Sequence, residues 1–183
     1  DYLLNVLRFI SILKVNDLEV HIGYSNTEGI LYSIAMPDSI SIGSYENLRS
    51  FAIKRFLDLE NGPMRAPRAR LYSSKLLQWI DYQYIEAMRK LIPGYENYFD
   101  ETQFRPLMFN PDYNWQFQKP EPYKHYFSVF SNQIHNLPEG QSDRIQHLKN
   151  IIRQAIDYFN EIENSVLLDS DSNGSHLPTW FNV

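Results

Sequence analysis

The sequence of 183 residues contains no cysteine. This absence excludes disulfide bonds, zinc sites with thiolate ligands and cysteine nucleophiles. The sequence also lacks an apolar run of about 18 residues, so no membrane-spanning helix is expected, and it shows no signal-peptide pattern. Its seven glycines form no phosphate-loop or dinucleotide fingerprint, and the G-x-S-x-G elbow of serine hydrolases is missing. No motif assigns a reaction, and whether the protein is an enzyme stays open.

The five histidines do not form the pattern of a metal site. Glu121 and His125 have the i,i+4 spacing of two ligands on one helix, but a site needs three or four ligands. Glu19 and His21 lie on one side of an expected strand, where an acid-base couple is geometrically possible, but a cross-strand or edge position is the simpler interpretation. We therefore expect neither a metal nor another cofactor.

What is present is the composition of a soluble globular protein, with 43% hydrophobic and 21% charged residues. The net charge of -5 argues against a general DNA coat, although it leaves room for a local basic patch. The absence of cysteine and of a signal peptide favours an intracellular location. Because the chain starts at Asp1 instead of methionine, we expect a processed, trimmed or excised protein, which leaves a removed targeting segment open.

Positive charge is concentrated in and around one loop. Residues 62–70 read Gly-Pro-Met-Arg-Ala-Pro-Arg-Ala-Arg, and the two prolines should stiffen this segment. From Arg49 to Lys75 the chain carries seven cations against Asp58 and Glu60. The cations are Arg49, Lys54, Arg55, Arg65, Arg68, Arg70 and Lys75. This basic loop is the strongest charge signal in the sequence.

The residues after the basic loop predict a long amphipathic helix from Ser73 to Leu91. Its core-facing arc would comprise Leu76, Leu77, Ile80, Tyr84, Ala87, Met88 and Leu91. Ser73 or Ser74 can cap its start, and Pro93 followed by glycine supplies its end. Trp79 and Tyr82 fall on the opposite, polar side of this helix.

The basic loop and the two aromatic residues suggest a binding surface. Arg65, Arg68 and Arg70 would hold phosphate or carboxylate, because guanidinium groups match those anions bidentately. Trp79 and Tyr82 would form a stacking or partner surface. The alternative is that the arginines are solvated or paired with acidic neighbours, and that a later segment covers the aromatic side chains.

The N-terminal part alternates between helical and strand patterns. Residues 2–13 predict a helix buried on most of its surface. Alternation of apolar and polar residues from Asp17 to Tyr24 predicts a first strand. A hairpin loop would follow at 25–29 and lead into a second strand at Ile30–Met36. Residues 39–42 would form a short third strand. We expect a small antiparallel meander here, followed by a helix from Tyr45 to about Glu60.

Between Tyr95 and Pro122 the periodicity fails, while aromatic residues are frequent. Prolines interrupt the segment at positions 106, 111, 120 and 122. Its aromatic residues are Tyr95, Tyr98, Phe99, Phe104, Phe109, Tyr113, Trp115 and Phe117. We expect an extended strap packed over the helices, with a partner-binding surface as the alternative.

Two helices and a tail complete the chain. The apolar stripes predict helices from Pro122 to Leu137 and from Asp143 to Leu167. The acidic tail from Asp169 should be mobile, although Trp180 and Phe181 could dock it back or reach a partner.

The sequence thus predicts a mainly helical α+β protein forming a single domain, 1–183. Its parts are 1–43 (helix and antiparallel meander), 44–94 (helix pair with the basic loop), 95–122 (irregular aromatic strap), 123–168 (helix pair) and 169–183 (mobile acidic tail). The preferred function is a noncatalytic protein-interaction or assembly module using Arg65, Arg68, Arg70, Lys75, Trp79 and Tyr82. The alternative is a nucleotide- or nucleic-acid-binding or processing protein that holds phosphate with the same loop. The expected partner is another protein, or else nucleic acid or a phosphorylated ligand.

Overall fold

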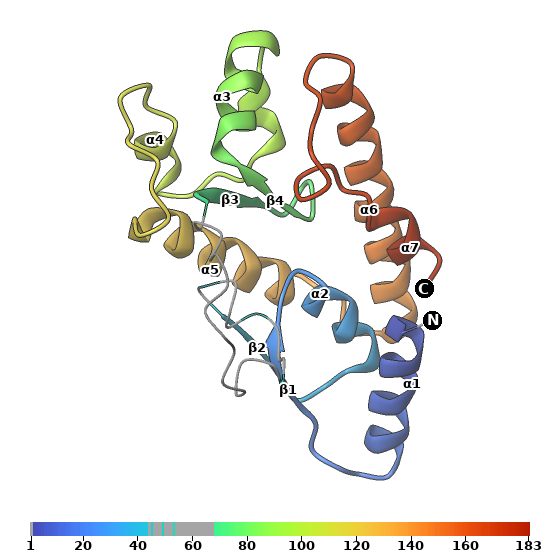
Figure 1. Cartoon of the computed structure of the whole chain (residues 1–183). Helices are drawn as coiled ribbons and strands as arrows, with labels where there is room; N and C mark the ends of the chain where they lie inside the picture. The colour runs from blue at the N-terminus through green and yellow to red at the C-terminus, as the bar shows by residue number, and fades with distance from the viewer. Residues whose placement is uncertain (1, 44, 46–48, 50–52, 54–67) are drawn as a thin grey trace. The chain divides into compact units, whose positions relative to one another are not determined.

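A computed structural model describes residues 2–43, 45, 49, 53 and 68–183 of the chain (Figure 1). The chain divides into two compact units, residues 1–67 and 68–183. The expected helix at 45–60 lies outside the described residues, except for positions 45, 49 and 53. Arg65 also lies outside the described residues. That the whole chain forms one domain stays a prediction.

The mainly helical α+β class is confirmed. The described residues form seven α-helices, one parallel pair of strands and one antiparallel pair. No helix in these described ranges is long and apolar enough to cross a bilayer.

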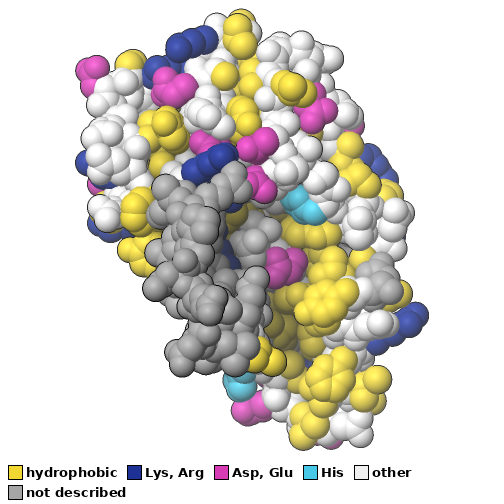
Figure 2. All heavy atoms as spheres, viewed as in Figure 1, with side chains coloured by type: hydrophobic (Ala, Val, Ile, Leu, Met, Phe, Trp, Pro, Cys, Tyr) yellow, Lys and Arg dark blue, Asp and Glu magenta, His cyan; other side chains and the backbone are white. Residues whose placement is uncertain are grey.

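The first unit begins with the predicted helix, α1 (Tyr2–Val15), whose buried face includes Leu7 and Ile10. Lys14 near the end of α1 donates to Asp38, and the Asp38 carboxylate also accepts from the backbone N–H of Val20. Hydrophobic side chains reach the surface on the face seen in Figure 2. In α1 the exposed hydrophobic residues are Tyr2, Phe9, Ile12 and Val15.

The prediction of an antiparallel meander in the first unit is wrong. Strand β1 (His21–Ser25) pairs in parallel with β2 (Ser39–Ile42). Between them the chain forms α2 (Gly29–Tyr32) and a 3₁₀ helix, η1 (Ser33–Ala35), in place of the expected second strand. The residues of α2 are all buried in succession, which a half-exposed strand with alternating faces does not permit. This helical connection returns the chain to the start of β1, as parallel pairing requires.

The second unit begins with an antiparallel hairpin, β3 (Arg70–Ser73) and β4 (Gln78–Asp81), followed by α3 (Tyr82–Leu91). The predicted helix is therefore correct only in its second half. The true start of the helix is capped by Asp81, whose side chain accepts from the backbone N–H of Gln83. In the hairpin Leu76, Leu77 and Ile80 are all fully buried, so the apolar pattern that suggested a helix is satisfied by a different structure.

After α3 the aromatic strap contains a 3₁₀ helix, η4 (Tyr95–Tyr98), and one short α-helix, α4 (Arg105–Met108). Its aromatic residues contribute to the interior: Phe99 is fully buried and Tyr95 is buried. The Phe109 ring lies in contact with both of them, with centroid separations of 5.4 Å. The strap therefore packs inward through part of its aromatic content.

The remaining helices are α5 (Pro120–His135), α6 (Gln141–Glu163) and α7 (Leu177–Phe181). The first two agree with the sequence to within a few residues. Figure 1 shows α7 lying against α6, and Trp180 of α7 is buried. The tail buries the side chains of Ser172, Leu177 and Trp180, which agrees with the alternative that Trp180 docks it back.

Candidate functional site

Two of the predicted anion-binding arginines are paired with carboxylates of the same unit. The Nη1 atom of Arg68 lies 3.3 Å from Oδ2 of Asp81 and 3.3 Å from Oδ2 of Asp169. Nη2 of Arg70 lies 3.3 Å from Oδ2 of Asp171. This is the alternative that the sequence allowed, in which the arginines are paired with acidic groups.

These ion pairs belong to a set of contacts between the tail and the hairpin. The hydroxyl of Ser172 accepts from the backbone N–H of Asp81 at 3.3 Å, and the hydroxyl of Tyr84 accepts from the backbone N–H of Asp169 at 3.2 Å. Nε2 of His176 lies 3.2 Å from the carbonyl oxygen of Leu77. We name residues 169–176 the C-terminal clasp. Its acidic residues occupy the positions at which an external anion would meet Arg68 and Arg70.

Trp79 is a core residue, not part of an exposed helix face. Its side chain is 4% exposed, and its ring lies 4.6 Å from that of Tyr126 and 5.7 Å from that of Tyr72, between centroids. The correction follows from the hairpin, because a strand directs Trp79 to the same face as its cross-strand partner Tyr72. Lys75 is exposed, and its ammonium donates to the carbonyl oxygen of Asn97 at 2.8 Å.

Tyr82 is 40% exposed and contacts one aromatic residue of the strap, Trp115. Its ring is nearly parallel to that of Trp115, with an angle of 19° and centroids 6.4 Å apart. The Trp115 ring in turn meets Tyr113 edge-on, with centroids 5.0 Å apart. We name Tyr82, Tyr113 and Trp115 the aromatic platform. The sequence placed the last two in the strap, but no local signal connected them with Tyr82.

Polar contacts hold the rim of the aromatic platform. The hydroxyl of Tyr113 donates to Oε2 of Glu121 at 3.0 Å. Burial and the Glu121 carboxylate both raise the pKa of Tyr113, so this hydroxyl remains a donor at neutral pH. The ammonium of Lys119 lies 5.8 Å from the centroid of the Tyr113 ring. The platform thus offers partly exposed ring faces in a fixed arrangement, together with a nearby cation.

His125 is fully buried and its two ring nitrogens have different partners. Nε2 lies 3.1 Å from the carbonyl oxygen of Tyr72, which can only accept, so Nε2 carries the proton. Nδ1 then accepts from the hydroxyl of Thr102 at 2.8 Å. Glu121 is engaged with Tyr113 instead of with this histidine. Within residues 2–43 and 68–183, no group of three or more His, Asp or Glu side chains could hold a metal ion.

We expect the free energy of unfolding to decrease as the pH falls below about 6.5. Burial is the main cause that lowers the pKa of both His125 and His176 from the ordinary value of 6.5. The unfolded chain therefore binds more protons, so stability is intact above pH 6.5 and is lost as the pH falls toward the folded-state pKa values. Each histidine contributes up to about 1.4 kcal/mol per pH unit. Urea denaturation between about pH 7.5 and pH 5.5 measures this slope.

The comparison for this prediction is His125→Gln, since glutamine keeps an N–H donor for the Tyr72 carbonyl but does not titrate. Its stability should depend less on pH than that of the wild type. His135→Gln, at an exposed position of α5, controls for the loss of one histidine. If the free energy of unfolding depended on pH equally in the wild type and in His125→Gln, the contribution assigned to His125 would be contradicted.

Comparisons with protein-family models, with curated protein sequences and with solved structures found no significant match.

Proposed function

We propose that the 68–183 unit is a noncatalytic protein-interaction module that binds an extended, proline-containing segment of a partner on the aromatic platform. The observation that carries this proposal is the contact between Tyr82 and Trp115, which joins a helix and the strap into one partly exposed aromatic surface. Tyrosine and tryptophan are enriched among residues that dominate binding energy, because they bury much apolar area with little loss of conformational freedom.

Proline-containing segments fit such a surface for a physical reason. A polyproline II segment is extended before it binds, and its rings pack on aromatic faces in the recognition mode of Pro-rich motifs. The centroid separations of 6.4 and 5.0 Å between neighbouring rings are each about the length of two residues of such a segment, which rises roughly 3.1 Å per residue. Lys119 beside Tyr113 supplies a donor for the backbone carbonyls that the segment leaves free.

The basic loop has a supporting role in this proposal. Arg68 pairs with Asp81, the residue before Tyr82, and the backbone N–H of Tyr82 donates to the carbonyl oxygen of Ala69 at 3.1 Å. These contacts position the start of α3 and with it one edge of the platform. In the alternative function a phosphate group would have to displace Asp169 or Asp171 from the arginines.

We expect peptides selected from a proline-rich display library to bind the intact chain with micromolar affinity, measured by fluorescence anisotropy of the labelled peptide. Tyr82→Ala and Trp115→Ala should each weaken binding by about tenfold or more, the loss typical of a central aromatic contact. Phe127→Ala is the matched control, since this aromatic residue of α5 is 39% exposed and lies outside the platform. It should leave the affinity within about twofold of the wild type.

Two outcomes would contradict the proposal. Selection could yield no binding peptide, or the peptides could bind Tyr82→Ala and Trp115→Ala as tightly as the wild type. Labelled single- and double-stranded oligonucleotides test the alternative in parallel. Salt-dependent oligonucleotide binding that is lost in an Arg68→Ala/Arg70→Ala variant would favour phosphate recognition by the basic loop.

A further inference from the structure

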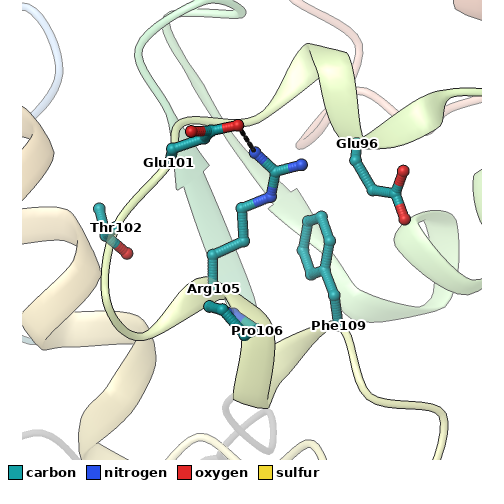
Figure 3. Close-up of a pocket in the computed structure, with 6 residues that line it drawn as sticks. All are labelled: Glu96, Glu101, Thr102, Arg105, Pro106 and Phe109. Carbon is teal, nitrogen blue, oxygen red and sulfur yellow. Dashed lines mark ion pairs between the residues drawn. The ribbon is translucent and has the colours of Figure 1, made fainter.

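A separate pocket of about 410 Å³ opens in the second unit, within the size range of small-molecule sites (Figure 3). It is formed by the stretch of chain that runs from η4 through α4. Its lining residues are Glu96, Glu101, Thr102, Arg105, Pro106 and Phe109. None of them belongs to the aromatic platform, so this pocket is independent of the proposed function.

Arg105 is the cationic group of the pocket. Its side chain is only 17% exposed, yet Nη1 lies 3.5 Å from a carboxylate oxygen of Glu101, whose side chain is 90% exposed. An exposed carboxylate at this distance contributes little, because solvent screens it and its side chain loses rotamer freedom. The guanidinium also lies 5.3 Å from the centroid of the Phe109 ring, which restrains its orientation. A ligand carboxylate could replace Glu101 and accept hydrogen bonds from two of the three guanidinium nitrogens.

The apolar wall of the pocket is rigid. The Phe109 ring is stacked on Tyr95 at an angle of 26° and meets Phe99 edge-on at 90°, both with centroids 5.4 Å apart. Tyr95 and Phe99 are buried, so the ring cannot swing inward to close the pocket. Pro106 adds a second apolar surface without a backbone N–H.

The carboxylate of Glu96 completes the arrangement. In Figure 3 the Phe109 ring lies between Arg105 and Glu96, so a cation and an anion flank an apolar wall. We infer that this pocket binds a small zwitterion, a free α-amino acid with an apolar side chain. Its carboxylate pairs with Arg105, its ammonium group with Glu96, and its side chain packs on Phe109 and Pro106. A cation and an anion lining the same pocket favour a ligand that carries a carboxylate and an ammonium together on one carbon, over a simple anion or a simple amine.

The test uses three probes that differ by one charged group: phenylalanine, 3-phenylpropionate, which lacks the ammonium, and 2-phenylethylamine, which lacks the carboxylate. Each is titrated into the isotope-labelled full chain, with the amide signals of residues 95–109 as the readout. We expect saturable millimolar binding of phenylalanine, and binding at least about fivefold weaker for each of the other two probes. Equal affinity for 3-phenylpropionate would overturn the zwitterion assignment, and no saturable shift with any probe would overturn the site.

Three variants assign the contacts. Arg105→Gln should weaken phenylalanine binding by about tenfold or more, and Arg105→Lys by less, since lysine keeps the charge but not the bidentate geometry. Glu96→Gln should weaken it by roughly threefold. Glu101→Gln is the matched control with an effect of opposite sign: removing the internal competitor should tighten binding by about twofold to fivefold. Unchanged affinity in folded Arg105→Lys and Glu96→Gln would overturn the inference even if Arg105→Gln failed to fold.

Discussion

Replacing Trp79 with alanine is expected to lower the free energy of unfolding by about 3–5 kcal/mol, the range for a buried tryptophan. The side chain is 4% exposed, and its removal would leave a cavity against Tyr72 and Tyr126, whose rings it contacts. Fully buried Tyr72 and Tyr126 cannot collapse into that space without breaking their own packing. Urea denaturation of the full chain, followed by circular dichroism, measures the change.

Tyr82→Ala is the matched comparison, because Tyr82 lies three residues further along the chain but is 40% exposed. Its effect on stability should be about 1 kcal/mol or less. The two variants therefore distinguish an effect on stability from an effect on binding. Trp79→Ala tests the packing of the core, and Tyr82→Ala tests binding at the aromatic platform. Equal denaturation midpoints for Trp79→Ala and the wild type would place Trp79 at the surface and contradict the hairpin.

The second large effect is expected for Gly174→Ala, which should destabilise the C-terminal clasp by roughly 2–5 kcal/mol. Gly174 has φ = +66°, a conformation that residues with a side chain rarely adopt. A β-carbon at this position would lie 2.3 Å from Cε2 of Phe159. Phe159 is buried on α6, where side chains are closely packed, so we expect the clasp itself to shift.

Thermal denaturation and limited proteolysis together measure this effect. We expect a lower melting temperature and faster cleavage after residue 168 in Gly174→Ala, because the clasp loses its fit against α6. Gly140→Ala is the control: the nearest atom to its added β-carbon is a carboxylate oxygen of the exposed Asp143 at 3.1 Å, and this side chain can rotate away. A similar decrease in melting temperature in Gly174→Ala and Gly140→Ala would show that the contact with Phe159 does not cause the destabilisation.

The helices α5 and α6 could be predicted because their determinants are local. Proline at the first helical position and an apolar stripe at helical spacing predicted a start at Pro122, two residues after the observed start of α5 at Pro120. The stripe of α6 includes Leu148, Ile152, Ala155, Phe159 and Ile162, all of which are buried. Side chains at these spacings share one face of a helix whatever the rest of the chain does.

The hairpin β3–β4 could not be predicted in the same way. Leu76, Leu77 and Ile80 satisfy the spacing of a helix, and they are equally buried in a turn and strand. The deciding factors are the cross-strand pair of Tyr72 and Trp79 and the packing of both rings on Tyr126 of α5. Tertiary contacts outweigh intrinsic propensities that differ by less than about 1 kcal/mol per residue.

The sequence by itself therefore determined the fold class, the approximate positions of the two long C-terminal helices and the concentration of positive charge between Arg49 and Lys75. Only the tertiary structure decided which contacts these residues make and which of them are buried. Arg68 forms an ion pair with Asp169, which lies 101 residues further along the chain. Trp79 is buried in the core, and the Tyr82 ring contacts the Trp115 ring of the strap. The physical reason is that helix periodicity depends on neighbours within one or two turns, whereas ion pairs and ring contacts depend on which distant segments the packed core brings together.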